Sequence, residues 1–247
     1  EAAARFQKAV DRISKNYTRP RDCEAYYHLG RVKKMQGKLD EAYRNLYRSA
    51  WDYEFRSASY RLLAEIDCHR GDFATALEHI DTSLTTNTED VKALGLKSAI
   101  LRHLGRYEEA IASASRALEL DPLDHLAVVE KCYAAQMVSS DDWIVDEVKS
   151  SIARFELRDL FGANSESYLE VAADYINCGL LADAESILTD AVEDRQIRPL
   201  EPKDLRTYPT IHYYLAYLCA KQNRGDKAIK WLESAIKCPA DYCFPFR

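Results

Sequence analysis

The residues that could perform acid–base or metal chemistry are scattered along the chain. The six histidines are His28, His69, His79, His103, His125 and His212. None pairs with another at the spacing by which two ligands on one helix hold a metal ion. The pairs Asp141-Asp142 and Glu108-Glu109 occupy expected turn and helix-start positions, where carboxylates act as solvated caps. Because no nucleophile elbow, phosphate loop or HExxH motif is present, we predict no catalytic residues, no metal site, no cofactor and no enzymatic activity.

The cysteines give no sign of a metal site or a disulfide framework. They are Cys23, Cys68, Cys132, Cys178, Cys219, Cys238 and Cys243, an odd number, and most fall in predicted helices. We interpret them as small, reduced core residues of a cytoplasmic protein. Cys238 and Cys243 lack both a CxxC spacing and a nearby histidine pair, which argues against zinc.

Arginines, lysines and tyrosines offer binding chemistry instead. Arginine forks bind carboxylates, and tyrosines give rigid amphipathic contact area. The predicted ligand-binding residues are Tyr27, Arg31, Lys34, Arg61, Glu65, Lys92, Arg102, Tyr133, Tyr213 and Tyr217. The alternative is a solvated face on which the tyrosines pack between neighbouring structural units. Whether these side chains share one surface depends on the helices that carry them.

A regular spacing of alanines indicates how those helices are organised. Ala42, Ala76 and Ala110 are 34 residues apart, and Ala184 and Ala228 continue the series after longer gaps. A glycine and a charged turn precede the first three, as in Gly37-Lys-Leu-Asp-Glu-Ala42. A fixed period of this length predicts an array of helical hairpins.

Each repeat is expected to pack two antiparallel helices through facing small residues, which let the helix axes approach closely. In the first helices the packing residues are Tyr26, Leu29 and Gly30; Tyr60, Leu63 and Ala64; Leu94, Lys97 and Ser98; Tyr168, Val171 and Ala172; and His212, Leu215 and Ala216. In the second helices they are Ala42, Leu46 and Ser49; Ala76, Ile80 and Ser83; Ala110, Ala114 and Ala117; Ala184, Leu188 and Ala191; and Ala228, Leu232 and Ala235.

This pattern resembles the tetratricopeptide repeat (TPR) family over almost the whole chain. The resemblance implies an all-α, right-handed superhelical solenoid of antiparallel helix pairs, with the first helices lining a concave groove. The ten predicted binding residues would then make that groove basic early and tyrosine-rich late. In family members that bind chaperone tails, a lysine and asparagines clamp a terminal carboxylate. Only Lys92 agrees at the matching positions, so the sequence does not support that ligand class.

The departures from the period suggest how the chain is divided. We expect residues 1–22 to hold the second helix of a truncated preceding repeat and 23–124 three regular repeats. A divergent repeat with an insertion follows at 125–164, a repeat with a Pro-containing loop at 165–208, and the last repeat with an aromatic C-terminal segment at 209–247. Since the chain starts inside a repeat without methionine, we interpret it as a fragment. The missing signal peptide then says nothing about location.

Charge and hydropathy exclude two classes of partner. The formal net charge is -6, which argues against a general nucleic-acid binder. The chain contains no run of 18 apolar residues, so we predict no membrane span. We therefore expect a noncatalytic module that binds a protein or peptide, preferably acidic, in the concave groove.

The alternative function is structural: a scaffold or dimerisation arm of a larger bacterial carbohydrate-related enzyme whose catalytic domain lies outside this chain. Residues 238–247 look similar to a segment of large bacterial proteins that joins TPR repeats to a β-rich domain resembling galactose mutarotases. In this alternative the partner is another domain of the same protein or a second copy of the chain.

Overall fold

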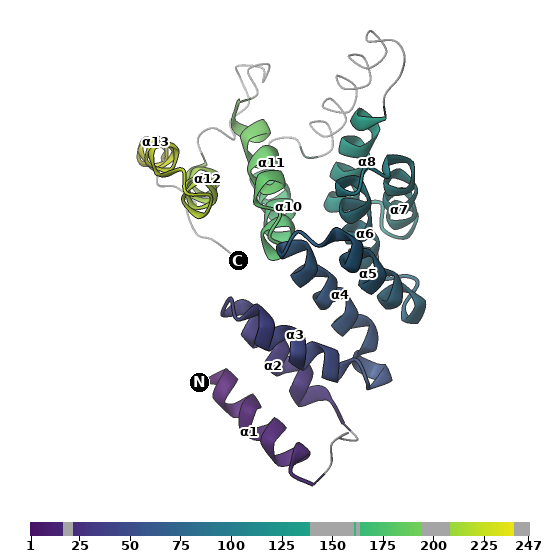
Figure 1. The fold of residues 1–247 in the computed structure, drawn as a ribbon. Helices are drawn as coiled ribbons and strands as arrows, with labels where there is room; N and C mark the ends of the chain where they lie inside the picture. Colours follow the sequence, from purple (N-terminus) through teal and green to yellow (C-terminus); the bar gives the residue numbers. More distant parts are fainter. Residues whose placement is uncertain (17–21, 139–160, 162–163, 194–207, 240–247) are drawn as a thin grey trace. The chain divides into compact units, whose positions relative to one another are not determined.

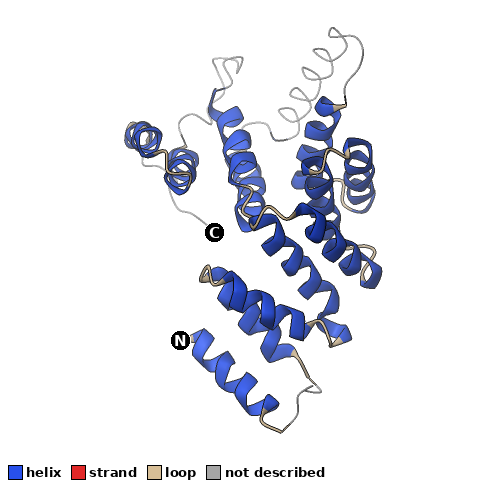
Figure 2. Ribbon diagram, in the orientation of Figure 1, coloured by secondary structure: helices blue, strands red, loops and turns tan. Residues whose placement is uncertain are grey.

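A computed structural model describes residues 1–16, 22–138, 161, 164–193 and 208–239. All regular structure in these residues is α-helical, and no strand occurs among them (Figure 2). The all-α fold class expected from the sequence is therefore confirmed. Within the same residues, no helix combines the length and the apolar character needed to cross a membrane.

The chain divides into two compact units, Glu1–Ser150 and Ser151–Arg247. The first holds α1 (Ala2–Ser14), α2 (Glu24–Met35), α3 (Leu39–Ser49), α4 (Tyr53–His69), α5 (Phe73–Thr86), α6 (Val91–His103), α7 (Tyr107–Leu120) and α8 (His125–Met137). The second holds α10 (Ser165–Asn177), α11 (Leu181–Glu193), α12 (Pro209–Lys221) and α13 (Gly225–Ile236) (Figure 1).

Consecutive helices pack in pairs, as a helical repeat requires. The pairs are α2 with α3, α4 with α5, α6 with α7, α10 with α11 and α12 with α13. We call the earlier member of each pair the first helix and the later one the second helix, and α8 is a first helix by its place in the series. The second helix expected after α8 lies outside the described residues. The predicted boundaries of the repeats remain predictions.

The turns inside the pairs depend on the left-handed backbone conformation. Gly37, Gly71, Gly105 and Gly179 have φ between 72° and 75°, which glycine adopts without a steric penalty. In the α12–α13 turn, Asn223 takes this place with φ 59°. Asparagine tolerates this region better than other residues with a Cβ atom. The last turn therefore keeps the geometry of the others although Gly225 stands two residues later.

Several first helices begin at an aspartate cap. The side chains of Asp52, Asp90 and Asp124 accept hydrogen bonds from the backbone N–H groups of Glu54, Ala93 and Ala127 respectively. Such caps satisfy donors that have no partner inside the helix, and each typically stabilises a helix by about 1 kcal/mol. Asp90 and Asp124 also belong to the ion pairs described below.

The predicted small residues lie where the paired helices meet. Ala42, Ala76, Ala110 and Ala184 are 0% exposed. The Ser98 hydroxyl donates to the carbonyl oxygen of Ala110 at 2.8 Å. These contacts require a close approach of the two backbones, as the sequence pattern predicted.

Five of the seven cysteines agree with their interpretation as core residues. Cys23, Cys68, Cys132, Cys178 and Cys219 are buried, and Cys238 is partly buried. Burial and the neighbouring carboxylates of Glu65 and Asp67 raise the pKa of the Cys68 thiol to about 12, so it is unreactive at neutral pH. Cys243 lies outside the described residues.

One predicted packing residue is wrong. Leu232 of α13 is 42% exposed, whereas its counterparts Leu46, Ile80 and Leu188 are 0% exposed. Elsewhere in the array, the first helix of the following repeat packs against the second helix, as α4 packs against α3. Among the described residues no helix follows α13, so this side chain stays at the surface.

The close approach at Gly30 gives a test of the packing. A Cβ atom at this position would lie 2.7 Å from Cγ and 2.8 Å from Cδ2 of the fully buried Leu46. We expect Gly30→Val to lower the free energy of unfolding by about 1–3 kcal/mol through overpacking. Gly225→Val is the matched control, because a Cβ atom there meets nothing within 4 Å. Urea melts followed by circular dichroism compare the two, and equal losses would contradict the tight crossing.

Candidate binding site

The ten predicted binding residues all lie on first helices. Tyr27, Arg31 and Lys34 come from α2, Arg61 and Glu65 from α4, Lys92 and Arg102 from α6, Tyr133 from α8, and Tyr213 and Tyr217 from α12. The first eight belong to one unit and the last two to the other. Within the first unit, most of the cations contact carboxylates on a neighbouring first helix.

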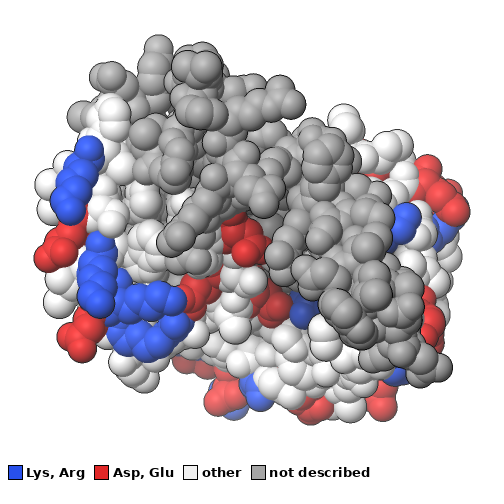
Figure 3. Space-filling model, turned by 90° about the horizontal axis from the view of Figure 1, so that it is seen from above, with Lys and Arg blue, Asp and Glu red and all other residues white. Residues whose placement is uncertain are grey.

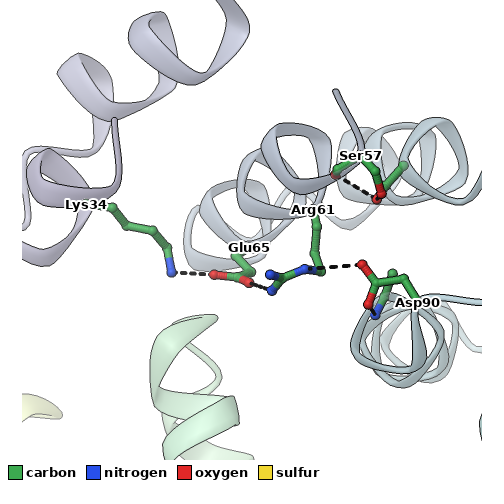
Figure 4. Close-up of polar contacts among 7 residues, drawn as sticks. Lys34, Ser57, Arg61, Glu65 and Asp90 are labelled. Atoms are coloured by element: carbon green, nitrogen blue, oxygen red, sulfur yellow. Dashed lines mark hydrogen bonds and ion pairs between the residues drawn. The ribbon is translucent and has the colours of Figure 1, made fainter. Parts of the chain in front are cut away.

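Lys34, Arg61 and Glu65 form one connected ion-pair group (Figure 4). The Lys34 Nζ donates to Glu65 Oε2 at 2.5 Å, and Arg61 Nη1 donates to Glu65 Oε1 at 2.8 Å. Arg61 Nε also lies 3.7 Å from Oδ2 of Asp90, the cap of α6. The group therefore links α2, α4 and α6, and it neutralises two of the predicted cations with two carboxylates.

Arg102 makes the most buried of these ion pairs. Its Nε and Nη2 atoms donate to the two carboxylate oxygens of Glu130 at 2.7 and 2.9 Å. The Glu130 side chain is 0% exposed and the Arg102 side chain 12%. The Arg102 guanidinium also lies 5.5 Å from the ring centroid of Tyr133. A forked pair of this kind fixes both side chains, so Arg102 joins α6 to α8.

The same relation recurs at Lys92, whose Nζ lies 3.8 Å from Oδ2 of Asp124, the cap of α8. In each case a cation of one first helix meets a carboxylate of the next. The partners are about one repeat apart in sequence, 31 residues for Lys34 with Glu65 and 28 for Arg102 with Glu130. We call these contacts the inter-repeat ion pairs. Asp90, Asp124 and Glu130 are not among the predicted residues, although this spacing in the sequence could have revealed them.

Arg31 differs from the other two predicted arginines, Arg61 and Arg102. It is exposed, and among the described residues no carboxylate lies within ion-pair distance of it. Its guanidinium stacks 5.6 Å from the ring centroid of Tyr27. The Tyr27 ring in turn lies 5.3 Å from Phe55 of α4. Stacking leaves the guanidinium N–H groups at the edge of the plane available to a ligand.

The two tyrosines of the second unit lie on one exposed face of α12. Tyr213 is 49% and Tyr217 46% exposed. The Lys221 ammonium lies 5.5 Å from the ring centroid of Tyr217, one helical turn further along. Two tyrosines and a cation at this spacing form a stripe suited to peptide contact on the second unit.

A second aromatic cluster was not predicted. Nδ1 of His79 in α5 is hydrogen-bonded to the carboxylate of Asp67 in α4 at 2.7 Å, and both side chains are buried. The rings of Tyr43, Tyr47 and Tyr60 lie 5.6–6.0 Å from the imidazole. Burial and the charge of Asp67 raise the pKa of Tyr43 to about 12. The cluster packs α3, α4 and α5 together, and its members are too far apart in sequence to form a recognisable motif.

A buried carboxylate holds the second unit together. Glu185 of α11 accepts hydrogen bonds from Gln222 at 3.0 Å, from Lys227 at 2.9 Å and from Arg224. Burial raises the pKa of Glu185, but these three donors outweigh burial and lower the pKa to about 2. Glu185 thus links α11 to the α12–α13 turn and stays charged at neutral pH. No group of three histidine, cysteine or acidic side chains in the described residues could hold a metal ion.

Comparison with known proteins identifies the repeats. A family model described as tetratricopeptide repeat matches residues 69–125 and 178–242. The chain belongs to the tetratricopeptide repeat family. A TPR protein from Parabacteroides merdae ATCC 43184 is 18% identical, with a TM-score of 0.59 over 98% of this chain and 87% of that one. The C-terminal part of a TPR repeat-containing protein from Cytophaga hutchinsonii is 13% identical, with a TM-score of 0.55 over 80% of this chain and 77% of that one.

These structures share the fold of the TPR protein described here, and at such identities they show the fold alone. A search of the curated proteins found no match. TPR folds typically serve as protein-interaction modules rather than as catalysts. Which ligand this TPR protein binds therefore has to be argued from its own residues.

Proposed function

We propose that this TPR protein is a noncatalytic module that binds an acidic peptide segment of a partner protein along its first helices. The observation that carries the proposal is the exposed Arg31 stacked on Tyr27, with no carboxylate of the described residues to neutralise it. An arginine whose guanidinium already lies over an aromatic ring loses less freedom when it binds a carboxylate, because the cation–π contact restricts it beforehand.

The inter-repeat ion pairs support this assignment by giving the other cations a different role. Arg61 and Arg102 already contact Glu65 and Glu130, so a ligand carboxylate would have to displace those partners. Lys92 is 48% exposed and lies beside Asp124, so it too is a member of an inter-repeat ion pair. We therefore assign electrostatic contact with the ligand to Arg31, and structural roles to Arg61 and Arg102.

A peptide-binding titration tests the proposal. The probes are fluorescein-labelled ten-residue peptides rich in Asp and Glu, with matched peptides in which Asn and Gln replace every acid. We expect measurable binding of acidic probes only, and about tenfold weaker binding by Arg31→Ala, since a charge-assisted hydrogen bond contributes about 1.5–3 kcal/mol. Fluorescence anisotropy at two salt concentrations measures both effects.

Arg116→Ala is the matched control. It removes an arginine from the second helix α7, where Arg116 forms an exposed ion pair with Glu119 at 2.8 Å. Its affinity for the acidic probes should equal that of the unsubstituted protein. If the amide probes bind as tightly as the acidic ones, or if both variants lose affinity equally, Arg31 does not recognise the ligand.

A further inference from the structure

One face of α13 carries an apolar stripe that is more exposed than its counterparts on the other second helices. Ile229, Leu232 and Ile236 are 56%, 42% and 78% exposed. They follow one another at three and four residues, so they share one side of the helix. At the position of Ile236, α3 carries Ala50 and α11 carries Val192, each 7% exposed, whereas Leu84 of α5 and Leu118 of α7 are partly buried. An apolar helix face of this kind is normally covered.

Charged residues border this stripe along one flank. Asp226, Lys230, Glu233 and Lys237 are all exposed, and no ion pair within the described residues involves any of them. At 100° per residue they lie on the same side of the stripe. Figure 3 shows blue and red side chains interspersed at the edge of the second unit formed by α12 and α13. The flank therefore carries both signs of charge, and no residue that the structure describes pairs with them.

We propose that two copies of the protein associate through this face, with the α13 helices antiparallel around a two-fold axis. The order of the charges supports this arrangement. An axis passing midway between residues 231 and 232 places Lys230 opposite Glu233 of the partner subunit. The same axis places Asp226 opposite Lys237 of the partner subunit. Both pairs thus require one and the same alignment of the helices.

The apolar stripe fits the alignment that the charges require. That axis brings Ile229 beside Leu232 of the partner subunit, so the stripes of the two copies cover each other. A symmetric dimer needs a self-complementary surface, and both the charges and the apolar residues of this face meet that condition. Because the contact involves few side chains, we expect a weak dimer that forms with rising concentration.

Sedimentation equilibrium of the full chain tests the pairing. We expect the apparent mass to rise from 28.3 kDa toward twice that value as the protein is concentrated. Leu232→Asp should keep the protein monomeric at every concentration. Leu123→Asp, which changes a leucine of the first unit that is 75% exposed, should dimerise normally. A chain that stays monomeric throughout overturns the proposal, and the stripe then belongs to a different partner.

Charge reversal tests the alignment itself. Lys230→Glu and Glu233→Lys should each weaken the dimer about tenfold, because each places like charges opposite each other in both symmetry-related pairs. The double variant Lys230→Glu/Glu233→Lys restores opposite charges and should recover the original dissociation constant. A double variant no tighter than either single one excludes the antiparallel arrangement. Neither outcome depends on peptide binding, which involves other helices.

Discussion

Replacing Arg102 with alanine is expected to lower the free energy of unfolding of the first unit by about 3–5 kcal/mol. The substitution leaves the Glu130 carboxylate, 0% exposed, without the guanidinium that donates to both of its oxygens. A buried charge that loses a forked pair of donors cannot regain the hydration it gave up on folding. Urea denaturation followed by circular dichroism measures the loss.

Two further variants separate the buried charge from other causes. Arg31→Ala removes an exposed arginine with no ion pair among the described residues, and it should change stability by less than about 0.5 kcal/mol. The double variant Arg102→Met/Glu130→Met removes both charges and should recover most of the lost stability, since apolar replacement of a buried pair is often neutral. If Arg102→Ala melts like Arg31→Ala, the inter-repeat ion pair does not stabilise the fold.

The contrast between these arginines shows how far the sequence could assign the site. Helical spacing placed Arg31, Arg61 and Arg102 on first helices, because periodicity fixes which face a residue occupies. It did not show which of them a carboxylate would neutralise. Which arginine meets a carboxylate depends on how the first helix of one repeat is shifted along its axis relative to the next first helix. This shift decides whether the partner lies 28 residues away, as for Arg102 and Glu130, or 31, as for Lys34 and Glu65. Glu130 was further hidden because it follows the apolar run Leu126-Ala-Val-Val129 and reads as part of the core.

The packing of the repeats was more accessible to prediction. An alanine such as Ala76 at a helix crossing is a local requirement, and it recurs in five of the repeats whatever the neighbours are. The prediction that Leu232 is buried was wrong because its burial depends on a following helix, which no feature of its own repeat specifies. Glu185 escaped notice for a related reason. It stands directly after Ala184, where the other repeats have Tyr43, Leu77 or Ile111, so it looked like one more exposed acid.

Glu185→Gln should destabilise the second unit by about 2–3 kcal/mol at pH 7, and the effect should disappear in acid. The pKa of Glu185 is lowered from 4.5 to about 2 in the folded protein. A carboxyl group with a depressed folded pKa stabilises the fold above its unfolded pKa, and this contribution is lost as pH falls through the folded pKa. The stability that Glu185 supplies is therefore complete above pH 4.5 and declines from there to about pH 2.

Melts at pH 7, 4 and 3 measure this dependence for the unsubstituted protein and for Glu185→Gln. The stability difference between them should be largest at pH 7 and should shrink as the pH approaches the folded pKa. Glu233→Gln, studied in dilute solution, is the control, because Glu233 is exposed on α13 and makes no ion pair within the described residues. It should follow the unsubstituted protein at every pH. If the loss of stability in Glu185→Gln stays constant from pH 7 to pH 3, the glutamine destabilises the unit through its hydrogen-bonding geometry. The negative charge between Lys227 and Arg224 then does not stabilise the second unit.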